Sequence, residues 1–293
     1  MTTLEAIIGG ATYSLSDGAP FAIIDSEDGM APVRRITDRG PLQDGDSDLG
    51  FRLEPIVWPL ALRLVANNIA THYDVRDTAL RIFRPSRTAI QIRWTLDNGA
   101  VRQLDCHVSG RLAFASRERQ GFNQKCVVPL RAANPLYYDP AMQAVTYGVG
   151  AGSGGFAFPL SWPASFGGST VNQTRAIAYV GSYREFPIVI IKGPITNPVV
   201  TNLTTGDKLD FTGVTIGSGT TYTIDCRPGK KSVLDQDGAN RIAGLSDDSD
   251  LATFSLEADP EAPGGINSVH VTGTSANATT EIYLQWYSRY VGI

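Results

Sequence analysis

The stretch from residue 90 to residue 108 constrains the fold more than any other part of the chain. It reads IQIRWTLDNGAVRQLDCHV. Polar residues separate the apolar ones on both sides of Asn98-Gly99, where the apolar positions are Ile90, Ile92, Trp94, Leu96, Leu104, Cys106 and Val108. Such alternation is typical of half-buried strands, and Asn-Gly is a strong signal for a two-residue hairpin turn. We therefore predict an antiparallel hairpin in which Cys106 is a core thiol and His107 points outward.

One segment has the period of a helix instead. Residues 71–85 read THYDVRDTALRIFRP, and an apolar stripe runs along them through Val75, Ala79, Leu80, Ile82 and Phe83. Thr71 is placed to cap the first turn and Asp74 to answer it from three residues on, as in a capping box. Pro85 ends the pattern, because proline cannot continue a helix. We expect this helix to pack on the sheet that the hairpin builds.

Beyond residue 141 the sequence predicts only strands. Short runs rich in β-branched and aromatic residues recur between glycine-rich turns; they are REFPIVIIKGPI, KLDFTGVTI, TYTIDC, NSVHVTGT and EIYLQWYSRY. Repeated short strands indicate a β-sandwich or barrel. The glycine-rich segment GVGAGSGGFAF fits a linker or an exposed loop. The fold class we predict is mainly β with one helix, in an N-terminal domain of residues 1–140 and an all-β C-terminal domain of residues 141–293.

The boundary between these domains falls at RAANPLYYDP, residues 131–140. Its prolines stiffen the chain and its tyrosines have apolar rings large enough to wedge between two bodies. We interpret it as an interdomain joint formed by Pro135, Leu136, Tyr137, Tyr138 and Pro140. Two other interpretations stay open at this point, a piece of core and a ligand site.

Bulk composition excludes several classes of protein. The chain has 293 residues, which suggests about two domains, and a net charge of −4, which argues against a surface that binds nucleic acid or membrane strongly. Its 3 cysteines form neither a disulfide framework nor a zinc pattern. No stretch has the roughly 18 uninterrupted apolar residues of a membrane span, and the first residues do not resemble a signal peptide. We expect a protein that folds in a reducing cytosol and has no membrane partner.

Motifs that would carry chemistry fail on inspection. The acidic run DGDSDLG at residues 44–50 begins like a calcium loop, but Leu49 and Pro55 occupy the positions that need glycine and glutamate. The tract AGSGG lacks the strand and helix that expose a serine nucleophile. The histidines at positions 72, 107 and 270 are far apart in the sequence. We predict no enzyme activity, no catalytic residue, no metal site and no cofactor.

Carbohydrate binding is a second functional hypothesis. Exposed aromatic rings on an all-β module can stack on sugar rings, and the candidates in the C-terminal half are Trp162, Tyr179, Tyr183, Tyr283 and Tyr287. Trp162, Tyr283 and Tyr287 are the glycan contacts we select. The alternative is that these rings pack in the core or across strands.

The order of segments along the chain resembles a known family. These segments are GPLQDGDSDLGFRLEP, DVRDTALRIFRP, PLRAANPLYYDP, FPIVIIKGPITNP and GGINSVHVTG. Together they look like a distal tail protein, the Dit-type component of bacteriophages with long, non-contractile tails (siphophages). The resemblance covers nearly the whole chain, and it depends on many ordinary residues and on no catalytic signature.

The resemblance implies a structural virion protein at the distal end of the tail, assembled in the host cytoplasm. Its N-terminal domain would be a β-sandwich with one helix and an extended hairpin that forms a belt-like hexameric ring. Its C-terminal domain would be a sandwich similar to galectins or carbohydrate-binding modules. The partners implied are the tail tube protein, a tail-tip hub or tail-associated protein, and receptor-binding or fibre proteins.

The resemblance also gives the acidic loop a role. Genome DNA would pass through the central hole of such a ring during ejection. Carboxylates that line a hole repel the DNA backbone and let it slide. We therefore predict that Asp44, Asp46 and Asp48 face this channel.

Overall fold

The computed structural model describes residues 2–16, 18–25, 29–115, 117, 119–149 and 169–293. The chain divides into two compact units, one of residues 1–140 with 290–293 and one of residues 141–289. The boundary between residues 140 and 141 coincides with the end of the segment 131–140, which contains the predicted joint. The last four residues group with unit 1, although the predicted C-terminal domain, residues 141–293, includes them.

Unit 1 contains a sheet whose strands follow the order β2-β1-β7-β8-β10-β6-β3. Their bounds are β1 Thr3–Ile8, β2 Ala11–Ser14, β3 Phe21–Asp25, β6 Ile56–Leu64, β7 Ile90–Thr95, β8 Val101–Val108 and β10 Gln124–Ala132. Shorter strands pair off this path, namely β9 Ala113–Phe114, β11 Tyr137–Tyr138 and β22 Arg289–Tyr290. β8 and β10 meet only at the pairs Val108–Leu130 and His107–Arg131, so the sheet has two halves with a narrow connection.

The two halves of this sheet share one core. Buried side chains from β1, β7 and β8 cluster with those from β6 and β10. The rings of Trp58 on β6 and Trp94 on β7 lie 6.4 Å apart between centroids. Two layers of strands that bury their inner faces against each other in one core form a β-sandwich.

The predicted hairpin at residues 90–108 is confirmed as β7 and β8. Cys106 is buried and His107 is exposed, as the alternation requires. The predicted turn type is wrong, because only Gly99 of the Asn98-Gly99 pair has a positive φ, at 81°. The Leu96 N–H donates to the Ala100 carbonyl at 2.9 Å, which leaves a three-residue loop with glycine in the left-handed position.

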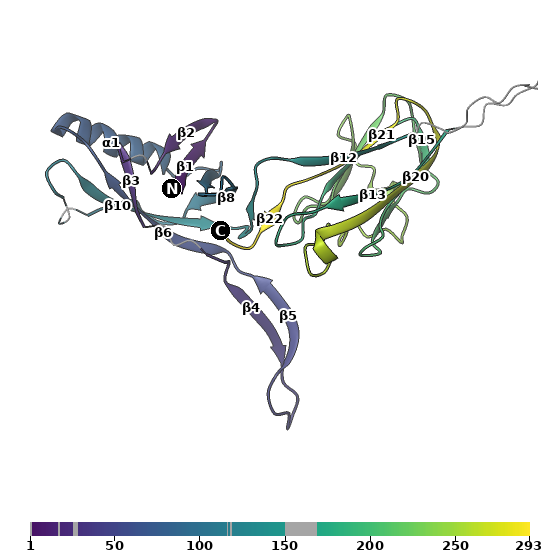
Figure 1. Ribbon diagram of the computed structural model, residues 1–293, viewed down its shortest axis with the longest axis horizontal. Coiled ribbons are helices and arrows are strands. Elements are labelled where there is room, and N and C mark those ends of the chain that lie inside the picture. Colours follow the sequence, from purple (N-terminus) through teal and green to yellow (C-terminus); the bar gives the residue numbers. More distant parts are fainter. Residues whose placement is uncertain (1, 17, 26–28, 116, 118, 150–168) are drawn as a thin grey trace, which may run out of the picture. The chain divides into compact units, whose positions relative to one another are not determined.

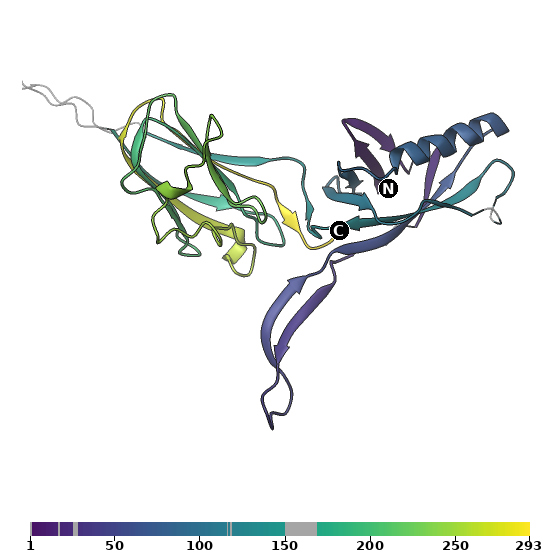
Figure 2. The ribbon, with the colours of Figure 1, turned by 180° about the vertical axis from the view of Figure 1, so that it is seen from behind.

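The single α-helix of the described chain, α1, spans Ile69–Ile82. Its cap is Asn68, whose Oδ1 accepts from the Thr71 N–H at 2.9 Å. The predicted cap at Thr71 is therefore wrong, because an asparagine three residues earlier already satisfies that N–H. Figures 1 and 2 show the helix lying over the strands of unit 1.

The buried stripe of α1 also differs from the predicted one. Leu80 is 46% exposed, and His72 is fully buried in its place, with Nδ1 2.7 Å from the Phe122 carbonyl oxygen. Val75, Ala79 and Ile82 face the core as predicted. A histidine with a backbone partner can occupy a core position, which the apolar pattern alone did not indicate.

One element of unit 1 stands apart from its sheet. Strands β4 (Val33–Asp38) and β5 (Ser47–Leu53) pair only with each other and form a two-stranded hairpin. Both views show this hairpin projecting away from the other strands of unit 1 (Figures 1 and 2). Its tip contains the acidic run at residues 44–50, and its shape agrees with the extended hairpin that the resemblance implies.

Unit 2 is a sandwich of two five-stranded sheets that share a single core. One sheet has the order β12-β21-β14-β18-β19, with bounds β12 Gln143–Gly148, β14 Ile188–Lys192, β18 Thr221–Asp225, β19 Ser232–Asp235 and β21 Glu281–Trp286. The other contains β13 Ser169–Ala178, β15 Ile195–Asn202, β16 Lys208–Asp210, β17 Thr215–Ile216 and β20 Ile266–Ala276. The predicted fold class, mainly β with one helix and two sandwich-like parts, is confirmed.

Among the described residues, no helix has the length and apolar character needed to cross a membrane. The same residues contain no group of three or more histidine, cysteine, aspartate or glutamate side chains placed to hold a metal ion.

Candidate interaction surfaces

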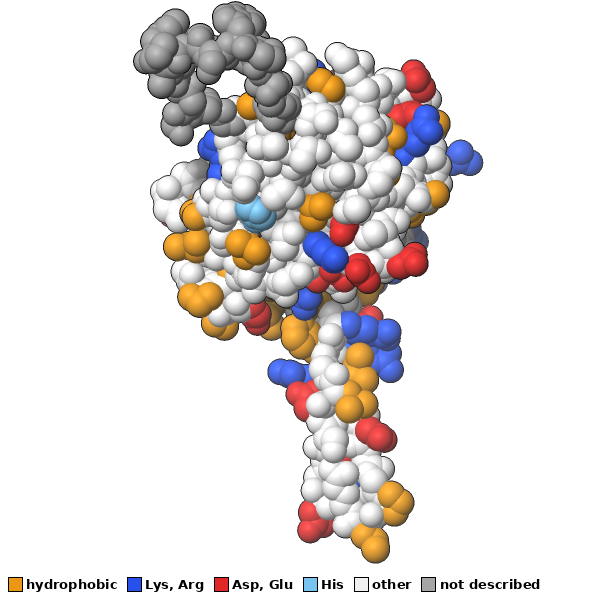
Figure 3. Space-filling view, turned by 90° about the vertical axis from the view of Figure 1, so that its right-hand side faces the viewer, with side chains coloured by type: hydrophobic (Ala, Val, Ile, Leu, Met, Phe, Trp, Pro, Cys, Tyr) orange, Lys and Arg blue, Asp and Glu red, His pale blue; other side chains and the backbone are white. Residues whose placement is uncertain are grey.

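The β4–β5 hairpin is exposed along almost its whole length. Every side chain of β4 is exposed, and the large apolar side chains of the hairpin reach solvent; they are Val33, Ile36, Leu42, Leu49 and Phe51. Figure 3 shows hydrophobic side chains beside charges of both signs along this projection. This hairpin lacks the burial that stabilises the rest of unit 1. A two-stranded hairpin without such burial is only marginally stable in water.

Contacts within the hairpin are polar or lie at its surface. The Arg35 guanidinium lies 5.6 Å from the centre of the Phe51 ring and donates to the Asp48 carboxylate at 3.0 Å. Arg52 donates to Glu54 at 3.0 Å near the base. Exposed ion pairs contribute about 0–1 kcal/mol each, so they orient the two strands without replacing a core.

The tip of the hairpin carries the acidic loop singled out in the sequence. Asp46 accepts from Arg39 at 2.6 Å and Asp48 from Arg35, so two of its three carboxylates are paired within the hairpin. Asp44 is exposed and has no ion pair within the described part of the chain. Leu42 is fully exposed with a φ of 63°, a left-handed conformation that is costly for a branched residue. That these acids face a DNA channel stays a prediction, and the pairing weakens the repulsion they would exert.

A pocket of about 370 Å³ opens on another part of unit 1, where β3, β6 and β10 lie side by side. Its described lining is one apolar side chain, three cations and three amides: Ile24, Arg63, Arg117, Lys125, Gln120, Asn123 and Gln124. Gln124 is only 4% exposed, and neither its Oε1 nor the Asn123 Oδ1 has a hydrogen-bond partner. A buried acceptor without a donor lowers the stability of the fold, so a bound group that donates hydrogen bonds to these two oxygens would be favoured. We name it the β3/β10 pocket.

The residues of the predicted joint lie at the end of unit 1. Tyr137 is buried in its core, with its ring edge-on to Trp94 at 5.5 Å between centroids. The Tyr138 hydroxyl accepts from the Gln103 amide at 2.6 Å and donates to Asp105 at 2.9 Å. Both tyrosines are thus anchored in the sheet of unit 1. Pro135, Leu136 and Pro140 are partly buried beside them.

Two of the three predicted glycan contacts lie on one face of unit 2. Tyr283 and Tyr287 are half-buried and point to the outer face of the sheet that contains β21. Tyr283 stands opposite Ile190 in the sheet, and its hydroxyl donates to Glu281, which holds the pKa of that carboxyl below its usual range. Trp162 lies outside the described residues.

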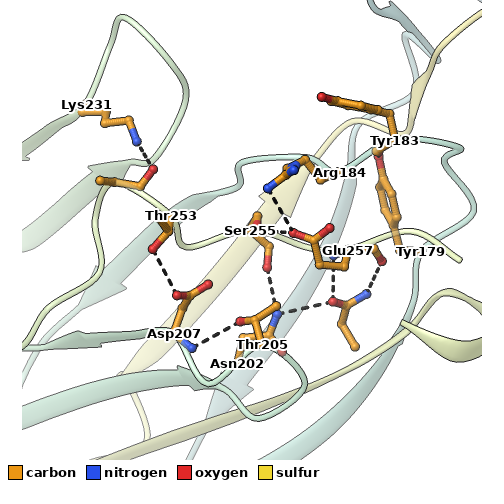
Figure 4. Close-up of polar contacts among 12 residues, drawn as sticks. Tyr179, Tyr183, Arg184, Asn202, Thr205, Asp207, Lys231, Thr253, Ser255 and Glu257 are labelled. Atoms are coloured by element: carbon orange, nitrogen blue, oxygen red, sulfur yellow. Dashed lines mark hydrogen bonds and ion pairs between the residues drawn. The ribbon is translucent and has the colours of Figure 1, made fainter. Parts of the chain in front are cut away.

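The other tyrosines considered, Tyr179 and Tyr183, belong to a structural network. Tyr179 is buried and its hydroxyl donates to the Tyr183 carbonyl at 2.6 Å. Figure 4 shows the neighbouring polar contacts, in which Ser255 donates to Glu257 at 2.7 Å and Asn202 donates to the Ser255 carbonyl at 2.8 Å. These bonds satisfy the polar groups of a buried loop, so they act in folding rather than in chemistry.

The cysteines are equally unsuited to chemistry. All three are buried, and burial raises the pKa of the Cys126 and Cys226 thiols to about 12. Desolvation also raises the pKa of the Cys106 thiol far above its usual range. A reactive cysteine needs a lowered pKa and access to solvent.

No protein-family model and no curated protein matches the chain. Solved structures do match. The Dit protein of phage SPP1, described as a hub adsorption apparatus in phages that infect Gram-positive bacteria, aligns over 98% of this chain and 98% of its own, with a TM-score of 0.65 and 10% identity. The chain has the fold of this distal tail protein.

Two baseplate structures of phage P2 share the same likeness. A chain of the activated baseplate with Ca aligns over 97% of this chain and 98% of its own, with a TM-score of 0.52 and 8% identity. The corresponding structure with Sr gives a TM-score of 0.50. The likeness therefore covers both units, and at such low identity it concerns the fold.

Proposed function

We propose that this protein forms a hexameric ring at the distal end of a siphophage tail. The ring joins the tail tube protein to the tail-tip hub or tail-associated protein and to receptor-binding or fibre proteins. Genome DNA crosses its central channel at ejection. The protein acts as a structural adaptor and not as an enzyme.

The exposed β4–β5 hairpin is the observation that carries this proposal. It is an ordered strand pair with large apolar side chains and no neighbouring strand in its own unit. Open strand edges and apolar side chains of this kind are normally covered in a functional assembly. A projection that meets a different surface on the next copy makes a heterologous contact, and such contacts form a ring when the rotation between copies closes. The fold shared with SPP1 Dit supports the same placement.

Unit 2 supports a second role beside the first. Its outer β21 face offers two half-buried tyrosines next to Ile190 and Gln285, a platform on which a sugar ring can stack. We propose that a host-surface glycan is one ligand of this face. Binding of purified cell-wall polysaccharide to the wild-type chain and to Tyr283→Ala tests the role, and equal binding by both would remove Tyr283 from it.

The ring is tested by native mass spectrometry and negative-stain electron microscopy of the purified protein. We expect about six copies around a central hole. A monomer at all concentrations, alone and with the tail tube protein, would contradict the adaptor role. A cell-wall lysis assay on the same sample should show no activity.

A further inference from the structure

Two surfaces of unit 1 carry opposite charge. The hairpin tip presents Asp44, which has no ion pair within the described residues, together with the partly paired Asp46 and Asp48. The β3/β10 pocket presents Arg63, Arg117 and Lys125. Arg63 is exposed and, like Asp44, makes no ion pair with any described side chain. Complementary patches of this kind select and orient partners.

Their apolar parts match as well. Leu42 stands fully exposed at the tip and is held there with a positive φ. Ile24, which is 43% exposed, lines the pocket. Strained residues persist where the surrounding structure or a function requires them. A fully exposed leucine at such a position has apolar area that a contact with the pocket would bury.

The amides of the pocket indicate what kind of anion fits. Gln124 and Asn123 each leave an acceptor oxygen without a donor. A phosphate would offer acceptors only, whereas a peptide segment brings backbone N–H donors together with its carboxylates. The pocket volume of about 370 Å³ lies in the range that accommodates a few side chains.

We propose that the hairpin tip of one copy docks into the β3/β10 pocket of the next copy, with Asp44 facing Arg63 and Leu42 covering Ile24. The inference depends on the proposed ring and names the contact that closes it. The tip and the pocket are different surfaces of the same unit, as a heterologous interface requires. The 6 residues of β4 carry the tip about 20 Å from its base, so it can reach beyond its own unit.

Asp44 cannot lie in this contact and also face the DNA channel. A residue buried between two copies affects assembly, whereas a residue facing the channel affects only the passage of DNA. Assembly measurements on charge variants therefore separate the two assignments.

The experiment is a charge exchange. Asp44→Arg and Arg63→Glu are each expected to weaken association at least about tenfold by analytical ultracentrifugation, since each places like charges together. The double variant should recover most of the wild-type association. Asp77→Arg and Arg84→Glu, two exposed sites on or next to α1, are the matched controls and should associate as the wild type. Leu42→Ser weakens association without any change of charge.

The outcomes distinguish this inference from the ring itself. If all charge variants form wild-type rings, the ring stands and the tip-to-pocket contact is wrong. If the wild type never associates, a fluorescein-labelled peptide of residues 39–48 replaces the second copy. Binding to the full chain that Arg63→Glu abolishes supports the contact, and no binding overturns it. Thermal unfolding of each variant shows that the fold is intact.

Discussion

Two of the hairpins of unit 1, β7–β8 and β4–β5, lie in opposite environments. In β7 buried side chains alternate with partly buried ones. β1 pairs with one edge of the β7–β8 hairpin, and β10 and β11 pair with the other. In β4–β5 both faces are exposed and neither edge has a partner. The local architecture is the same, yet only the first is stabilised by its own chain. In the proposed ring, the second is completed by another molecule, as its exposed surface requires.

The difference shows where stability and function are placed in this unit. The β7–β8 hairpin contributes Ile92 and Trp94 to the core, so changes there should unfold the unit. The β4–β5 hairpin contributes almost nothing buried, so changes there should leave the unit folded and affect assembly.

Truncating the core hairpin should have the largest effect. Trp94 is buried against Trp58 and Tyr137. Trp94→Ala should lower the free energy of unfolding by about 3–5 kcal/mol, because it removes a large side chain and leaves a cavity. Urea unfolding followed by tryptophan fluorescence measures it. A loss below about 1 kcal/mol would mean that β7–β8 is not central to the core.

Changing the projecting hairpin should separate folding from assembly. Phe51 is 46% exposed, so Phe51→Ser should change the free energy of unfolding by no more than about 0.5 kcal/mol. Association should nevertheless weaken by about 2 kcal/mol or more, as for an aromatic anchor in an interface. Sedimentation and urea unfolding of the same sample give both quantities. Normal association would place the interface elsewhere.

Substitutions in the turns of the two hairpins should change the stability in opposite directions. Gly99 has a φ of 81° with open space around it, so Gly99→Ala should cost about 1 kcal/mol from backbone strain alone. Leu42→Gly relieves the strain at the hairpin tip and should not destabilise the unit. Thermal unfolding of both variants tests this. A loss of stability in Leu42→Gly would show that the tip leucine packs within its own copy.

The surface ion pair should have the smallest effect. Arg35→Gln removes the contacts to Asp48 and Phe51, which are exposed and screened by salt. The expected loss is about 0.2–1 kcal/mol in hairpin stability, and hydrogen exchange of the β4 and β5 amides should rise several-fold. The exchange of β7 amides is the internal control. If it rises equally, the two hairpins unfold together and the contrast fails.

The parts of the fold that could be predicted are those determined by residues close together in the sequence. Alternation around Asn98-Gly99 gave the first hairpin because its buried face requires that pattern. The cap of α1 was missed because Asn68 precedes the apolar stripe, and the burial of His72 depends on the Phe122 carbonyl from a distant loop. The alternation along residues 281–287 placed two glycan candidates, Tyr283 on β21 and Tyr287 directly after it, on one face.

The projecting hairpin was hidden by its own composition. Its acidic tip favoured a solvated loop, although Asp44-Gly45 is a turn signal and Leu49, Phe51 and Leu53 alternate after it. The β3/β10 pocket could not be predicted, because Ile24, Arg63 and Lys125 come together only through strand pairing. Both features depend on how distant segments meet or on which side chains stay exposed, and such features leave a weak pattern in the sequence.

The most direct test of the account removes the projecting hairpin. A chain in which residues 34–52 are replaced by a short Gly-Ser turn is compared with the wild type by native mass spectrometry and negative-stain imaging. We predict hexameric rings for the wild type and a folded monomer with unchanged unfolding for the shortened chain. Rings formed equally well without the hairpin would contradict the central claim.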